Sequence, residues 1–128
     1  MKQALLLFAH GARDASWALP FEDVARRIAL QSPHTPVVLA YLEFLSPNVV
    51  EAARGLAETG CTEVSVVPLF LGAGGHVRKD LPQLLEQLRA RYPQVVWRLH
   101  PAIGETERVV QAMADASLEL LRGTPAPR

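Results

Sequence analysis

The sequence predicts an α/β protein with a four-stranded, mainly parallel sheet and helices on both faces. Short apolar runs alternate four times with longer segments in which apolar residues recur at helical spacing. Because the connections between them are short, this order is typical of parallel sheets with right-handed crossovers. The length of 128 residues fits one domain. We expect that domain to span residues 1–122 and residues 123–128 to form a frayed tail.

Four apolar runs are predicted to be strands. The first, residues 3–9, is almost continuously apolar, as expected for a strand that is covered on both faces. The others are residues 37–42, 64–71 and 95–99. Pro68 lies inside the third run, where it cannot donate a ladder hydrogen bond, so a local irregularity or the end of regular pairing is expected near it.

Helical spacing predicts helices at residues 17–30, from Pro47 to Gly60, at 77–92 and at 106–121. Ser16 and Ser46 are expected to cap the first two, since serine is a preferred N-cap residue. The third has the clearest amphipathic pattern. The apolar stripe of the last consists of Val109, Val110, Met113, Leu120 and Leu121.

Composition argues against several classes of protein. The formal net charge is zero, so no global field favours nucleic acid or a membrane surface. The single cysteine, Cys61, excludes an internal disulfide and any paired-cysteine metal or redox motif. The apolar run at residues 4–9 is too short for a membrane span and lacks a signal-peptide cleavage pattern. We therefore expect a cytoplasmic protein with no nucleic-acid or membrane partner.

Metal-binding or proton-carrying residues follow three of the predicted strands. They are His10, Glu43 and His76. Because the carboxyl ends of parallel strands lie on one edge of a sheet, these residues can converge there. Two imidazoles and a carboxylate suit a divalent transition metal such as cobalt, iron, nickel or zinc. Three protein ligands would leave positions open for a substrate. The alternative is a capping turn with an incidental surface histidine.

A glycine-rich turn at residues 72–75 comes directly before His76. Gly74 and Gly75 are candidates for a wall that a ligand approaches closely, since glycine has no side chain to exclude it.

Cations flank two of these strand ends. Arg13 follows His10, and Arg78 and Lys79 follow His76. They are candidates for neutralising a polyanionic ligand, and arginine is well shaped for carboxylates. The alternative is a solvated helix start at which acidic neighbours balance the charge.

Competing motifs are incomplete. The glycine turn has Val77 where a dinucleotide fingerprint needs its last glycine, and it lacks the Gly-Lys-Ser/Thr of a P-loop. No Gly-x-Ser-x-Gly element supports a serine hydrolase. A flavodoxin-like module that binds a phosphate ligand is kept as a distant alternative.

Three stretches together resemble the class II chelatases, which insert metal into cyclic tetrapyrroles. They are LLLFAHGARD at residues 5–14, LAYLEFLSPNV at 39–49 and VVPLFLGAGGHVRKDLP at 66–82. The resemblance is closest to the small single-domain sirohydrochlorin cobaltochelatases and spans nearly the whole chain. The first motif usually reads His-Gly-Ser-Arg in that family, and Ala12 replaces the serine here.

The resemblance implies that His10 and His76 bind the incoming metal and that Glu43 assists. It implies a tetrapyrrole substrate, whose carboxylates Arg13, Arg78 or Lys79 would meet. The metal is itself a substrate, with cobalt expected first and iron or nickel as alternatives, and no organic cofactor is expected.

Larger relatives in this family contain two copies of the unit facing across a cleft. The resemblance therefore implies that this single copy builds the cleft as a homodimer. A non-catalytic metal or tetrapyrrole carrier on the same fold is the alternative from a different functional class.

Overall fold

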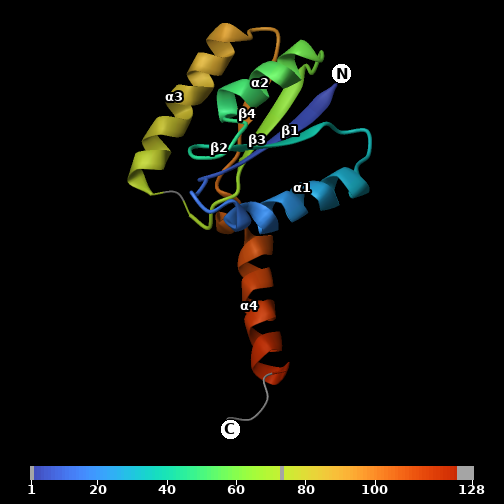
Figure 1. Ribbon diagram of the computed structural model, residues 1–128, viewed down its shortest axis with the longest axis vertical. Coiled ribbons are helices and arrows are strands. Elements are labelled where there is room, and N and C mark those ends of the chain that lie inside the picture. Colours follow the sequence, from blue (N-terminus) through green and yellow to red (C-terminus); the bar gives the residue numbers. More distant parts are fainter. Residues whose placement is uncertain (1, 73, 124–128) are drawn as a thin grey trace.

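The computed structural model describes residues 2–72 and 74–123, and of His76 it describes only the backbone. Its elements are β1 (Gln3–Ala9), η1 (Ala15–Ala18), α1 (Leu19–Gln31), β2 (Val37–Tyr41), α2 (Val49–Glu58), β3 (Glu63–Pro68), α3 (Gly75–Arg91), β4 (Val96–Leu99), η2 (Ile103–Glu105) and α4 (Glu107–Gly123). The strands form one sheet in the order β2-β1-β3-β4, and every pair is parallel (Figure 1). The predicted fold class is confirmed. Of the predicted tail at residues 123–128, Gly123 is instead the last residue of α4, and residues 124–128 lie outside the described residues.

One face of the sheet carries most of the core. The even-numbered residues of β1 pack there with side chains of α2 and α3. Leu6, Phe8, Val66 and Leu85 are fully buried in this layer. Strands that are apolar on both faces belong in the middle of such a sheet, which agrees with the central position of β1.

The other face is covered mainly by α1. Trp17 and Phe21 pack there against Leu39 and Tyr41 of β2. Helix α4 does not return to this face: Figure 1 shows it projecting from the rest of the chain, and it has no buried residue. Within the described residues its predicted apolar stripe is exposed apart from Val109, which is half-buried. None of the described helices is long and apolar enough to cross a bilayer.

The predicted caps of the first two helices are wrong. Asp14, not Ser16, caps the first turn, because its carboxylate accepts from the backbone N–H of Ser16 at 3.0 Å. Asn48, not Ser46, caps α2 by accepting from the N–H of Glu51 at 2.8 Å. The reason is that the carbonyl of Pro47 accepts a hydrogen bond from Tyr41, which keeps residues before Asn48 outside the helix.

The third strand, predicted over residues 64–71, ends at Pro68, and residues 69–71 form a loop. The end of regular pairing near Pro68 was one of the two expected outcomes there. One further hydrogen bond follows the proline, from the N–H of Leu69 to the carbonyl of Phe8 at 2.8 Å. Helix α3 begins two residues earlier than predicted, at Gly75.

Gly11→Ala should lower the free energy of unfolding by about 2–4 kcal/mol. Gly11 has φ +94°, and a Cβ atom there would lie 1.8 Å from the carbonyl oxygen of Glu43. Gly55→Ala in α2 is the matched control, since a Cβ there meets nothing within 4 Å. It should raise stability by about 0.5–1 kcal/mol, because alanine favours a helix interior. Urea unfolding followed by circular dichroism measures the stability of both variants. Equal unfolding midpoints would contradict the predicted overlap at Gly11.

Candidate active site

His10 directly follows β1 and is exposed at the carboxyl edge of the sheet. Its ring stacks on that of Phe70, with centroids 4.2 Å apart and planes 23° apart. Phe70 is only 4% exposed, and its ring meets Phe8 edge to face at 5.3 Å. The chain at Phe70 is also held by its carbonyl, which accepts from the N–H of Gly104 at 2.9 Å. A fixed aromatic ring therefore backs the imidazole.

Phe70 was not identified from the sequence as a site residue. It lies in the apolar run that was predicted to be strand, where a phenylalanine indicates core. The available signal was Pro68, because a chain that leaves the ladder at a proline is free to turn its next side chains toward the neighbouring strand end.

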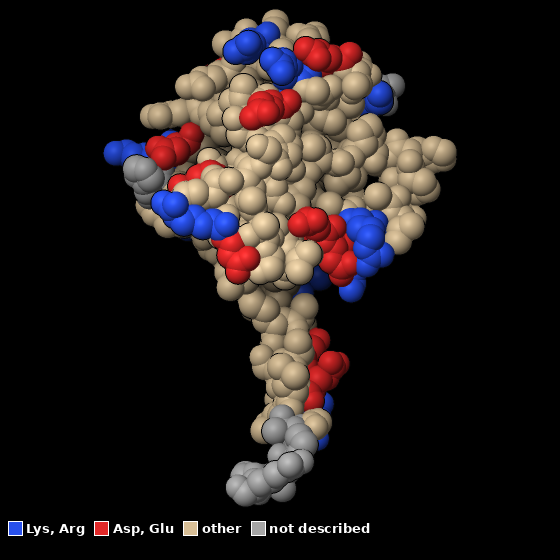
Figure 2. All heavy atoms as spheres, in the orientation of Figure 1, with Lys and Arg blue, Asp and Glu red and all other residues tan. Residues whose placement is uncertain are grey.

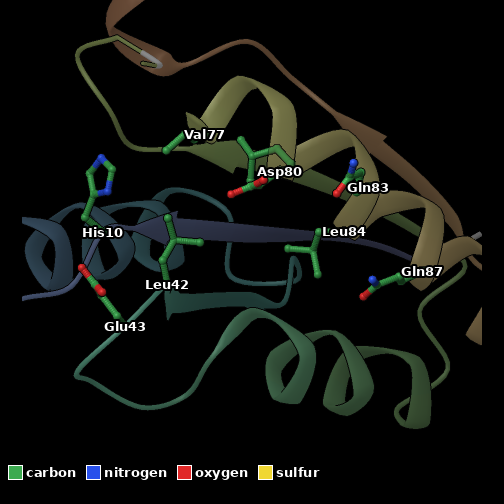
Figure 3. Close-up of a pocket in the computed structure, with 9 residues that line it drawn as sticks. His10, Leu42, Glu43, Val77, Asp80, Gln83, Leu84 and Gln87 are labelled. Carbon is green, nitrogen blue, oxygen red and sulfur yellow. The ribbon is translucent and has the colours of Figure 1, made fainter. Parts of the chain in front are cut away.

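Glu43 lies beside His10 because the pairing of β1 with β2 continues past both strands. Leu42 donates its N–H to Ala9, and Glu43 donates its N–H to His10, each at 3.0 Å. Figure 3 shows the Glu43 carboxylate on the His10 side of the loop. Residues 33 positions apart in sequence thus share one corner of the molecule.

A tight turn follows Glu43. Phe44 has φ +68°, and the N–H of Leu45 donates to the carbonyl of Glu43 at 2.8 Å. This combination is that of a classic γ-turn, which is rare, and a bulky residue at positive φ costs about 1–3 kcal/mol. The Phe44 ring is 55% exposed, and the guanidinium carbon of Arg13 lies 4.8 Å from its centroid, within cation–π range.

The amino-terminal end of α3 forms the opposite wall. Gly74 is its N-cap residue and offers no side-chain cap, while its carbonyl accepts from Arg78 at 3.0 Å. The backbone of His76 lies in the first turn, and its side chain lies outside what the structure describes. A Cβ at Gly74 or Gly75 would meet nothing within 4 Å. Their suggested role toward a ligand therefore stays a prediction.

A cavity of about 500 Å³ runs from His10 along α3 (Figure 3). It is lined by His10, Leu42, Glu43, Val77, Asp80, Leu81, Gln83, Leu84 and Gln87. Apolar side chains (Leu42, Val77, Leu81 and Leu84) share this lining with polar ones, a composition and size that suit a small-molecule site. Among the residues that the structure describes, neither a lysine nor an arginine lines it.

The predicted cations are placed outside this lining. Arg78 pairs with Glu105 of η2 at 3.2 Å and lines a smaller cavity beside His100. Lys79 and Arg13 are exposed. The roles of these three residues toward a ligand stay predictions.

The acidic neighbour of Arg13 is directed elsewhere. Asp14 accepts from the Ser16 hydroxyl at 2.7 Å and from the Ser16 N–H, and these bonds lower the pKa of its carboxyl group. Asp14 is therefore ionised while it caps η1.

The metal-binding hypothesis depends on His76. Among the side chains that the structure describes, no three from histidine, cysteine, aspartate and glutamate are grouped closely enough to hold a metal ion. His10 and Glu43 provide two candidate donors, and the third in the predicted set is the imidazole outside the described residues.

Known proteins match this chain over nearly its whole length. The family described as CbiX matches residues 4–120. A sirohydrochlorin cobaltochelatase of Sulfurisphaera tokodaii is 32% identical over 122 residues, which cover 94% of this chain and 95% of that protein. A crystal structure of a putative cobalamin biosynthesis CbiX protein from Marinobacter aquaeolei has a TM-score of 0.84 at 34% identity and covers 95% and 99% of the two chains.

A longer protein carries the same unit. The sirohydrochlorin chelatase SirB from Bacillus subtilis, solved in complex with cobalt, matches with a TM-score of 0.79 at 25% identity. The match covers 94% of this chain and 51% of SirB, and a further SirB structure holds Fe³⁺. Because the family match spans 117 of the 128 residues, residues 4 to 120 inclusive, this chain belongs to the CbiX family.

Proposed function

We propose that this protein is a metal chelatase that inserts a divalent metal, cobalt first, into sirohydrochlorin. The observation that carries the proposal is the position of His10 and Glu43 at one end of a cavity of about 500 Å³ whose lining is partly apolar. A flat macrocycle needs apolar surface beneath its ring, and an incoming cation needs donor atoms at one place on it. The activities named for the family's relatives agree with this arrangement.

The reaction exchanges two protons for one metal ion. The divalent ion forms bonds to the four ring nitrogens, and the two pyrrole N–H protons leave, so the charge balances. We assign His10 and His76 to holding the ion, since neutral imidazole is a good ligand for divalent transition metals. Glu43 lies where it can complete the ligand set or accept a proton. The stacking of His10 on Phe70 supports this, because it fixes the plane of the imidazole.

Cobalt is the first choice of metal, with iron and nickel as alternatives. Imidazole and carboxylate donors bind all three, and cells select among them by supply as well as affinity. The reaction as written uses no organic cofactor. We place it in cobalamin or sirohaem biosynthesis in the cytoplasm, within a unit that spans residues 1–122.

A carrier that binds metal or tetrapyrrole without turnover remains the second function. It would use the same cavity, so turnover is the property that separates the two.

We further propose that two copies of the chain form the working unit, and α4 supports this. Its apolar side chains are exposed, including Val110 at 46%, Met113 at 41% and Leu120 at 71%. Figure 2 shows the acidic side chains of α4 gathered on one side of the helix and uncharged side chains over much of the rest. A helix with one apolar face is stabilised by packing against a partner surface.

The sheet offers a matching surface. On the face that α1 covers only partly, Val67 of β3 is half-buried and Val96 of β4 is 51% exposed. Exchange of an identical helix between two copies is a low-cost way to form a symmetric dimer. We propose that α4 of each copy covers this strip on the other.

Anaerobic incubation with sirohydrochlorin and Co²⁺, Fe²⁺ or Ni²⁺ should give the absorbance change of metal insertion, fastest with cobalt. His76→Ala should abolish insertion and keep the circular dichroism spectrum, because it removes a proposed metal ligand. His34→Ala is the control, since His34 is exposed in the loop before β2, at the other edge of the sheet. Absence of a spectral change from folded wild-type protein with every metal would refute chelatase activity.

Phe70→Leu should lower kcat about tenfold with little change in KM for sirohydrochlorin. The loss of a stacked ring pair corresponds to about 0.5–1.5 kcal/mol and releases the His10 imidazole from one orientation. Phe21→Leu removes a comparable aromatic contact, with Trp17 at 4.7 Å, on the other face of the sheet. It should leave kcat unchanged. Equal effects of the two substitutions on kcat would show that Phe70 acts only through stability.

Wild-type protein should sediment as a dimer, and the double variant Met113→Glu/Leu120→Glu should sediment as a monomer, because charge would replace the apolar face of α4. Gln111→Glu is the control: it adds charge half a turn round the helix from Leu120. Analytical ultracentrifugation measures all three. A monomeric wild type at micromolar concentration would contradict the dimer.

A further inference from the structure

The polar residues of the cavity are sorted by charge along α3. At the His10 end stand the carboxylates of Glu43 and Asp80, and at the other end stand the amides of Gln83 and Gln87. Gln83 lies one turn beyond Asp80 and Gln87 two turns beyond it, about 4.5 and 10 Å along the helix axis. The cavity is thus acidic where the cation is proposed to bind and neutral further along.

The two glutamines face the cavity. Both line it, and Figure 3 shows them on α3 near Leu84, with Leu42 across from them. Among the side chains that the structure describes, neither amide has a hydrogen-bond partner, whereas Glu86 on the same helix pairs with Arg89 at 2.8 Å. These two amides lie one turn apart and share the lining with apolar side chains such as Leu84. They offer hydrogen-bond donors to a ligand that lies along the helix.

The charge pattern restricts which part of a ligand can lie at each end. A carboxylate of the ligand is repelled by Glu43 at the His10 end, since like charges placed together are costly. The same carboxylate can accept N–H bonds from the glutamine amides without facing a negative charge. A hydrogen bond from a neutral donor to an ionised acceptor is among the stronger hydrogen bonds in proteins.

We infer that Gln83 and Gln87 bind side-chain carboxylates of the tetrapyrrole and so set its position over His10. The inference rests on the proposed chelatase function and adds specificity-determining residues to it. The ring nitrogens then lie toward the acidic end, where the metal arrives, and the carboxylates lie along α3.

Substitutions at Gln83 and Gln87 test this by whether each raises or lowers the Kd for sirohydrochlorin. Methionine keeps the shape and helix propensity of glutamine and removes the donors, so Gln83→Met and Gln87→Met should each raise the Kd for metal-free sirohydrochlorin and the KM about tenfold, with kcat within about twofold. Gln87→Lys should lower the Kd and make it rise with salt, and Gln87→Glu should raise it above the methionine value. A purely structural role would not give this order. Gln94→Met, at an exposed position before β4, is the matched control and should change nothing.

The substrate side of the test uses sirohydrochlorin with its carboxylates methylated. Wild-type protein should bind the acid more tightly than the ester, and Gln83→Met/Gln87→Met should lose most of that preference. If wild-type protein inserts metal and the series leaves Kd, KM and the ester preference unchanged, the glutamine assignment is overturned and the chelatase stands. If it binds the macrocycle with this glutamine dependence and inserts no metal, the assignment stands and the chelatase proposal fails. Failure to bind sirohydrochlorin at all overturns both.

Discussion

The hydrogen bond from the Glu43 N–H to the His10 carbonyl fixes the candidate site. It extends the pairing of β1 and β2 by one residue past each strand, at 3.0 Å. Gly11 makes the contact possible, because any side chain there would overlap the carbonyl of Glu43. The imidazole and the carboxylate are therefore positioned by backbone geometry, which is stiffer than two flexible side chains could be.

A second glycine, Gly104, likewise allows a close backbone contact, on the opposite side of His10. A Cβ at Gly104 would lie 2.3 Å from the backbone of Leu71, so η2 packs directly on the loop that follows β3. Phe70 in that loop is held beneath the imidazole, with its carbonyl bonded to Gly104. The end of the central strand is thus flanked by β2 on one side and by the β3 loop on the other, and both neighbours are fixed by close backbone contacts.

Helix α4 relates the fold to the proposed assembly. The core that α2 and α3 build is complete within the described chain, with its largest side chains fully buried. The opposite face is not complete, since Val96 remains half exposed while the leucines of α4 face solvent. Burial of such side chains contributes about 25 cal/mol per Å² of apolar surface. Packing against a second copy would contribute this free energy to the proposed dimer. The proposed cleft would then be formed by two identical chains.

Sequence periodicity determined the order of elements and the fold class, because strands covered on both faces and amphipathic helices have local signatures. The sequence also identified His10 and Glu43 as strand-end residues that can converge, and Pro68 as a place where regular pairing is disturbed. The cap at Asn48 was missed because a hydrogen bond from Tyr41 to Pro47, distant from any helix signal, decides where α2 begins.

What only the tertiary structure decided are the contacts between segments far apart in sequence. These are the stacking of Phe70 on His10, the pairing of Arg78 with Glu105, and the sharing of one cavity by Glu43 and the glutamines of α3. The surface against which α4 packs is likewise a matter of tertiary structure. Its apolar stripe reads the same from sequence whether the helix covers its own sheet or another copy's, because periodicity records which face is apolar and not what packs against it.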